Sequence, residues 1–292
     1  MISLSGTQLA YRWLTTVPSR LAPAEREAAR AFRRECLSWM RGARVEGFAL
    51  GDKDETLLGA MREPVLRFFV RKKLPAKRVN TLIPAVISLP GTGRRVMTDV
   101  SISRGARASC GPASRIFGQS IGSNDAGTAS CTLYAIGNPS TRYVLSAWHV
   151  LCGPDGRAAD PINCDNAVCG SLSGKYQSLT PQPSKDPYTI QSFDGALGLL
   201  NPGTDDPGNA QMNVNFAGIR QTPVAQGDTL TCYGSYSGKA NSAAVRSPAV
   251  TAPIGYRWGY ITFANLIETA LLRQRATVEL PWSIHRATWS AT

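Results

Sequence analysis

The pattern of hydrophobic and polar positions changes along the chain, and its first part predicts helix. Residues 23–42 (PAEREAARAFRRECLSWMRG) combine strong helix formers with a mixed polar and apolar pattern. Proline suits the first turn of a helix and glycine often follows the last turn, so we expect this helix to begin near Pro23 and to end at Gly42. Residues 1–43 are therefore predicted to form an N-terminal helical segment.

Three short runs with strand character follow. They are VEGFALG (45–51), PVLRFFVRKKL (64–74) and RVMTDVSISR (95–104). In the second run, Arg67 and Arg71 alternate with Leu66, Phe68 and Val70. One face of the strand therefore carries arginines and the other only apolar side chains, which suits a strand with one solvated face. Together with a helix, these strands predict a small α/β unit over residues 44–107.

The remainder of the chain has the pattern of an all-β protein. Residues 108–128 are rich in Gly, Ser, Ala and Asn, and are predicted to be a linker or an irregular lead-in. From residue 129 onward, short strand-like runs alternate with turn residues, and no long helix is predicted. The runs are ASCTLYAIG, RYVLSAWHVL, GALGLL, DTLTCYGSY, AAVRSPAVTA and YITFANLI. Repeated short strands predict a sandwich or a barrel, so the expected fold class is mainly β.

Composition allows a folded core and shows an uneven charge. Hydrophobic residues make up 43% of the 292 residues, and the formal net charge is +12. Residues 1–107 hold 20 Lys and Arg against 9 Asp and Glu, whereas residues 108–292 hold 12 against 11. A solvated basic face is the favoured explanation, and a surface for nucleic acid or anionic lipid is the alternative. The basic part contains no helix-turn-helix pattern and no basic motif interleaved with aromatic residues, which disfavours nucleic acid as a partner.

Targeting signals and cysteines give expectations about the compartment and about metals. No apolar run reaches the ~18 residues of a membrane span, and the first residues lack a signal-peptide pattern. An odd count of seven cysteines then favours a reducing, cytoplasmic location. Four residues separate Cys164 from Cys169 and only Cys152 lies near, which leaves a zinc site short of a ligand. We therefore expect no metal and no cofactor, and we favour loop cysteines over a disulfide.

One of the two histidines stands in a setting that suggests chemistry. His149 follows the apolar run YVLSAW, and Asp194 precedes the apolar run in FDGALGLL, 45 residues later. A buried core histidine and a turn aspartate are the ordinary explanations of the two residues taken singly. As a pair, an imidazole can accept the proton of a nucleophile while a carboxylate fixes its tautomer and stabilises the imidazolium. His149 and Asp194 are thus the candidate catalytic residues.

These segments resemble the trypsin-like serine peptidases. The block AGTASCTLYAIGNPSTRYVLSAWHVL (126–151) has the Gly-Thr, hairpin and Ala-x-His-Val arrangement of that family, and FDGALGLL is similar to its aspartate strand. The likeness extends over about residues 44–272 and includes a bacterial subgroup whose peptidase domain follows an N-terminal α/β prefix. It implies a chymotrypsin-like double β-barrel over residues 129–292 and a peptide or protein substrate. It also implies His149 as general base and Asp194 as the group that orients it.

The sequence departs from the family at the nucleophile. The family carries Gly-Asp-Ser-Gly, whose backbone N–H groups also form the oxyanion hole, and this sequence does not contain that motif. After Leu272, where the motif is expected, it reads RQRATVELPWSIHRATWSAT. The nearby serines are poor substitutes because they lack the right flanking glycines or fall in a turn; they are Ser235, Ser237, Ser283 and Ser290. The nucleophile is therefore unassigned, and His285 is expected to be an exposed tail residue.

A shifted reading frame can supply the missing motif. If third bases are chosen freely, codons for residues 275–284 read two bases later encode Gly-Asp-Ser-Gly followed by an apolar strand. We therefore hypothesise a frameshift, which would leave the chain altered after about residue 272 and the second barrel incomplete. The polypeptide as written is then expected to be inactive. A non-catalytic pseudo-peptidase that binds peptide or protein, and a nucleic-acid-associated protein, are the alternatives.

Overall fold

A mainly β architecture, as expected, forms the described part of the protein. The computed structural model describes residues 4–52, 64–73, 81–103, 106–107, 120–122, 127–129, 131–151, 161–164, 167–176, 179–191, 193–204, 222–233, 240–256 and 259–269. Strands dominate these ranges, and one sheet curls into a half-barrel. The finer expectation of a chymotrypsin-like double barrel stays a prediction.

Two helices precede the first strand. They are α1 (Gly6–Thr15) and α2 (Pro23–Gly42), with the short 3-10 helix η1 (Pro18–Arg20) between them. The predicted bounds of the helix over residues 23–42 are confirmed, with proline at its first position. Helix α1 starts at a capping box, in which Ser5 and Gln8 exchange side-chain and backbone hydrogen bonds.

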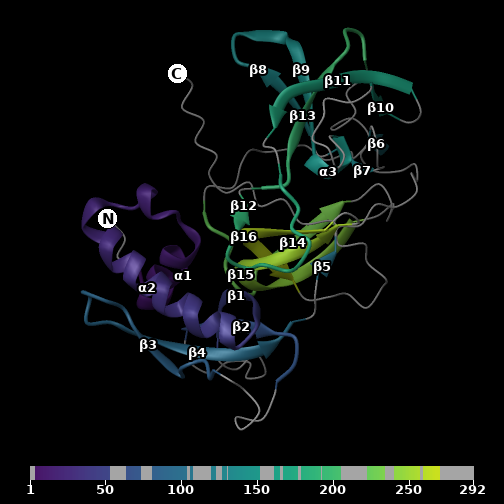
Figure 1. Cartoon of the computed structure of the whole chain (residues 1–292). Helices are drawn as coiled ribbons and strands as arrows, with labels where there is room; N and C mark the ends of the chain where they lie inside the picture. Colours follow the sequence, from purple (N-terminus) through teal and green to yellow (C-terminus); the bar gives the residue numbers. More distant parts are fainter. Residues whose placement is uncertain are drawn as a thin grey trace.

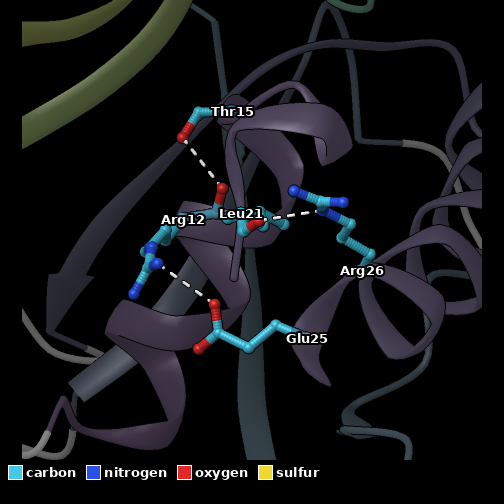
Figure 2. A network of polar contacts seen from close by, with 5 residues as sticks. All are labelled: Arg12, Thr15, Leu21, Glu25 and Arg26. Carbon is cyan, nitrogen blue, oxygen red and sulfur yellow. Dashed lines mark hydrogen bonds and ion pairs between the residues drawn. The ribbon is translucent and has the colours of Figure 1, made fainter. Parts of the chain in front are cut away.

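Polar contacts join the two helices (Figure 2). The guanidinium of Arg12 on α1 donates to the carboxylate of Glu25 on α2 at 3.0 Å. Nε of Arg26 donates to the carbonyl oxygen of Leu21 at 3.0 Å, which fixes the connection after η1. The hydroxyl of Thr15 donates back to the carbonyl of Tyr11 at 2.9 Å. The ion pair of Arg12 and Glu25 thus joins α1 to α2, while the bond of Thr15 lies within α1 and that of Arg26 ties α2 to the connection before it.

A large sheet receives strands from both ends of the chain. Among the described residues it has nine strands, in the order β12-β16-β15-β1-β2-β4-β3, with β14 and β5 also pairing with β15. The N-terminal members are β1 (Val45–Asp52), β2 (Pro64–Val70), β3 (Val86–Ser88), β4 (Arg95–Ile102) and β5 (Ala106–Arg107). The later members are β12 (Ile190–Gln191), β14 (Thr229–Tyr233), β15 (Ala240–Tyr256) and β16 (Gly259–Thr269). The predicted strands starting at residues 45, 64 and 95 are confirmed as β1, β2 and β4.

A second sheet carries the segment around the candidate histidine. Its order over the described residues is β7-β6-β10-β11-β13-β9-β8, seven strands in all. They are β6 (Ser120–Gly122), β7 (Gly127–Thr128), β8 (Cys131–Ala135), β9 (Asn138–Ser146), β10 (Ile162–Cys164), β11 (Ala167–Tyr176) and β13 (Ala196–Leu200). Strands β6 and β7 fall inside residues 108–128, so this predicted linker contributes to the sheet. Figure 1 shows the second sheet on the opposite side of β15 and β16 from the helices.

The N-terminal part is joined to the later strands by backbone pairing. Strand β1 pairs antiparallel with β15, with Phe48 opposite Thr251 and Ala49 opposite Val250. The hydroxyl of Tyr11 on α1 lies 3.0 Å from that of Thr251 and accepts the backbone N–H of Asn265 at 3.1 Å. The division into a prefix over 44–107 and a peptidase domain over 129–292 stays a prediction. The structure adds that one sheet crosses that boundary.

The cysteines differ from expectation in one respect. Cys169 on β11 is disulfide-bonded, so the preference for loop cysteines without a disulfide was wrong at this position. Spacing alone could not show this, because a disulfide depends on the approach of two Cβ atoms in space. The predicted cytoplasmic location stays a prediction. Among the described helices, none is both long and apolar enough to cross a membrane.

Candidate functional site

His149 lies on a single helical turn that follows a strand. Strand β9 ends at Ser146, and α3 (Trp148–Leu151) begins two residues later. The apolar neighbours Trp148, Val150 and Leu151 are buried and anchor this turn in the core. The side chain of His149 is itself only 10% exposed. The expected strand is therefore confirmed, but the histidine stands just beyond its end.

Strand pairing brings Asp194 to this histidine. Asp194 precedes β13, and β13 pairs antiparallel with β9 so that Ala196 lies opposite Ser146. Asp194 comes two residues before Ala196, and His149 comes three residues after Ser146. Because antiparallel strands run in opposite directions, the end of one and the start of the other lie at the same edge of the sheet. The register thus places together two residues that are 45 positions apart in the chain.

The aspartate contacts both the ring and the backbone of the histidine. Nδ1 of His149 lies 2.6 Å from Oδ2 of Asp194, and the backbone N–H of His149 donates to Oδ1 at 3.2 Å. The Asp194 side chain is only 6% exposed. An ionised carboxylate can only accept hydrogen bonds, so Nδ1 carries the proton and Nε2 is the ring's basic nitrogen. This is the tautomer that a general base needs.

A third residue, Tyr256, completes the cluster and was missed by the sequence analysis. Its hydroxyl donates to Oδ2 of Asp194 at 2.7 Å. Its ring meets the imidazole of His149 edge-on, with ring centres 5.2 Å apart and planes at 67°. Tyr256 ends β15, and neither its spacing from His149 nor its neighbours in GYRWGY distinguish it from an ordinary strand tyrosine. Only the arrangement in space identifies it.

The hydrogen bonds determine the charge of the aspartate. Burial alone would raise the pKa of Asp194 by penalising the carboxylate. The hydrogen bond and charge of the His149 ring, the Tyr256 hydroxyl and the His149 backbone N–H all act in the opposite direction. Their combined effect holds the pKa of Asp194 below its ordinary value. The carboxylate is therefore ionised at neutral pH although it is buried.

The site lies where the two sheets meet. His149 and Asp194 belong to the second sheet, whereas Tyr256 belongs to the first. A common apolar cluster joins the two sides; it includes Trp148, Leu151, Ile162, Ala196, Ile254, Ile261 and Phe263. In Figure 1, α3 faces the strands β14, β15 and β16 of the first sheet. The contacts around the histidine thus come from segments on both sides of this junction.

The other candidates of the sequence analysis lie elsewhere. Ser235 and Ser237, and also Ser283, His285 and Ser290, fall outside the described residues, so the nucleophile stays unassigned. Within the described ranges, no group of three or more His, Cys, Asp or Glu side chains is arranged to hold a metal ion.

No protein-family model matches the chain, and no curated protein matches it either. The chemistry of the site must therefore be argued from the arrangement of its residues.

Proposed function

We propose that the cluster is the base half of a serine-endopeptidase-type site. His149 takes the proton of a hydroxyl nucleophile through Nε2, and Asp194 holds the imidazole and stabilises its protonated form. The observation that carries this proposal is the 2.6 Å contact between Nδ1 of His149 and a buried carboxylate that is ionised at neutral pH. The substrate class is a peptide or protein, as the resemblance to trypsin-like peptidases implies.

We also propose that the fold is chymotrypsin-like. A chymotrypsin-like protein places its catalytic residues between two β-barrels, and here the His149–Asp194 pair lies between two sheets. The second sheet carries the pair, and strands β14, β15 and β16 represent the second barrel. The position of the pair at the junction and the curled sheet support this assignment.

The missing motif limits what the polypeptide as written can do. Residues 1–292 contain no Gly-Asp-Ser-Gly, so neither a nucleophile nor an oxyanion hole is assigned. General-base catalysis without a nucleophile or donors for the oxyanion gives little acceleration. We therefore expect no peptide hydrolysis by this polypeptide. The same absence favours a second candidate function, a non-catalytic module that binds peptide or protein.

A covalent probe tests the proposal in two versions of the chain. The first is the 292-residue polypeptide, and the second carries the shifted frame from codon 275, which restores Gly-Asp-Ser-Gly. A serine-directed fluorophosphonate should label only the second version. Labelling should fall by at least about 100-fold in His149→Ala, since the serine then lacks its base. Glu27→Gln, at an exposed carboxylate on α2, is the control and should keep full labelling.

The outcomes separate the two candidate functions. Labelling of the 292-residue polypeptide would show that it has an active serine and would end the expectation of inactivity. If the frame-restored chain stays unlabelled, or is labelled equally well after His149→Ala, the peptidase proposal is wrong. The genomic codons give an independent check, since codons 275–280 must permit Gly-Asp-Ser-Gly in the shifted frame.

A further inference from the structure

Tyr256 contacts both members of the proposed pair. Its hydroxyl and Nδ1 of His149 share the same acceptor, Oδ2 of Asp194, at 2.7 and 2.6 Å. The other carboxylate oxygen accepts the backbone N–H of His149. Three donors therefore surround one buried carboxylate, and two of them come from the histidine itself. Tyr256 is the donor in this set that comes from the other sheet.

The backbone around Tyr256 holds it in place. In the hairpin of β15 and β16, Tyr256 pairs with Gly259 and Gly255 pairs with Tyr260. On the other side of β15, Gly255 pairs with Arg107 of β5. A residue at the end of a strand that is paired on both sides has little freedom to move. The pairing thus fixes the backbone of Tyr256, and its hydrogen bond to Asp194 and its edge contact with His149 set the position of the hydroxyl.

We infer that Tyr256 is a positioning residue that fixes the Asp194 carboxylate, and through it the imidazole of His149, from the opposite sheet. This inference rests on the proposed His149–Asp194 site. A hydrogen bond to a charged acceptor is directional, so the phenol selects one orientation of the carboxylate. The edge of the tyrosine ring against the imidazole restricts the rotation of the histidine as well.

This arrangement makes the geometry of the pair depend on the junction of the two sheets. When the sheets are docked, Asp194 has all three donors. When β15 moves away, the carboxylate loses the phenol and keeps only donors from His149. The histidine is then held by an aspartate whose own orientation is less restricted. Proper alignment of the base thus requires both halves of the described fold.

The small number of histidines makes a direct test possible. The chain contains two, so a protein with 15N-labelled histidine gives only two imidazole spin systems, and His285 serves as internal reference. The readout is the change of the His149 Hδ1 resonance at acid pH, where Asp194 becomes protonated. It is separate from the change at higher pH, where the imidazole itself takes up a proton. In Tyr256→Phe the carboxylate loses one stabilising donor. Its protonation, and the change of the resonance, should move to higher pH by about 0.5 to 1 unit.

A graded variant keeps the test valid if Tyr256→Phe folds poorly. Incorporation of 3-fluorotyrosine at position 256 makes the phenol a stronger donor, so the change of the resonance should move to lower pH. Tyr260→Phe is the matched control: it removes a phenol from the neighbouring strand of the same hairpin, and it should leave the resonance unchanged. Tyr260 exchanges backbone hydrogen bonds with Gln182.

The outcomes distinguish this inference from the proposed function. Protonation of the imidazole itself also occurs in Asp194→Asn and is not the readout. Asp194→Asn removes the titrating carboxylate, so the acid-pH change of the Hδ1 resonance should disappear. If it persists in Asp194→Asn, the pair itself is misassigned and the proposed function fails. If it disappears there, but Tyr256→Phe and the fluorotyrosine variant both titrate as the wild type does, only the positioning role of Tyr256 is overturned.

Discussion

The N-terminal core and the core at the site differ in what they bury. Large aromatic rings fill the N-terminal core, including Trp13, Phe32, Trp39, Phe48 and Phe68. Several of these rings meet edge-on, such as Trp39 and Phe68 with centres 5.0 Å apart. The core at the site is mainly aliphatic and has buried polar groups beside it, among them Ser146, His149 and Thr262.

The two cores therefore have different roles: the N-terminal core stabilises the fold, and the core at the site holds the buried polar groups. Apolar rings stabilise a fold without requiring hydrogen-bond partners, whereas a buried carboxylate or imidazole is tolerated only when its hydrogen bonds are satisfied. The N-terminal core therefore supplies stability, and the site uses some of it to hold the buried charge of Asp194. The two regions are connected by the pairing of β1 with β15 and by Tyr11.

The largest effect is expected from opening a cavity in the N-terminal core. Phe68→Ala should lower the free energy of unfolding by about 3 to 5 kcal/mol, since its ring is fully buried. If the shared sheet couples the two regions, the Hδ1 resonance of His149 should vanish at the same urea concentration as the indole N–H resonances of Trp13 and Trp39, which lie in the N-terminal core. Ile136→Ala, at a fully exposed turn position, is the control and should change stability by less than about 0.5 kcal/mol. Two separate transitions in Phe68→Ala would show that the regions unfold independently.

An intermediate effect is expected at the connection between the regions, and it depends on pH. Burial, opposed by the hydrogen bonds of Thr251 and Asn265, raises the pKa of Tyr11 from 10.0 to about 12. Above pH 10 the unfolded chain releases this proton while the folded protein keeps it, so stability falls as the pH rises. The loss should reach about 2 kcal/mol by pH 12. Denaturant unfolding at a series of pH values measures it.

Substitution assigns that alkaline loss to Tyr11. Tyr11→Phe should cost about 1 to 2 kcal/mol at pH 7, because Thr251 and Asn265 lose their partner, and should remove most of the decline between pH 10 and 12. Tyr188→Phe is the comparison, since the pKa of this half-buried tyrosine is also raised to about 12, mainly by burial. Solvent screening should make its share smaller. An unchanged alkaline decline in Tyr11→Phe would contradict the assignment.

The smallest effect is expected at the solvated contact between the helices. Glu25→Gln removes the ion pair with Arg12 shown in Figure 2, in which the two side chains are 29% and 40% exposed. Exposed pairs contribute little, so the loss should be about 0.5 kcal/mol and should shrink in high salt. Glu27→Gln, an exposed carboxylate on the same helix, is the matched control. A loss above about 2 kcal/mol for Glu25→Gln would mean that the helix contact, and not the aromatic core, dominates the N-terminal part.

Much of the local structure could be predicted because it depends on neighbours in the chain. The bounds of α2 follow from Pro23 and Gly42 and from the helix formers between them. The strands at β1, β2 and β4 follow from alternating or continuous apolar runs. The positions of His149 and Asp194 at the edges of two apolar runs also predicted that they could meet, and the register of β9 and β13 accounts for their contact.

Contacts between distant segments could not be predicted. Nothing near Tyr256 in the sequence indicates that its hydroxyl reaches Asp194, because the two residues are 62 positions apart and lie on different sheets. The pairing of β1 with β15 likewise joins segments that are distant in the chain.

Local patterns in the sequence predict the helix over residues 23–42 and the strand-rich character of the rest. They also identify His149 and Asp194 as a candidate pair and show that Gly-Asp-Ser-Gly is absent. The fold adds that one sheet joins both ends of the described chain and that Tyr256 completes the cluster. The two kinds of information differ because helix formation and apolar alternation depend on residues a few positions apart. Strand pairing and the satisfaction of a buried charge depend on which segments meet in space.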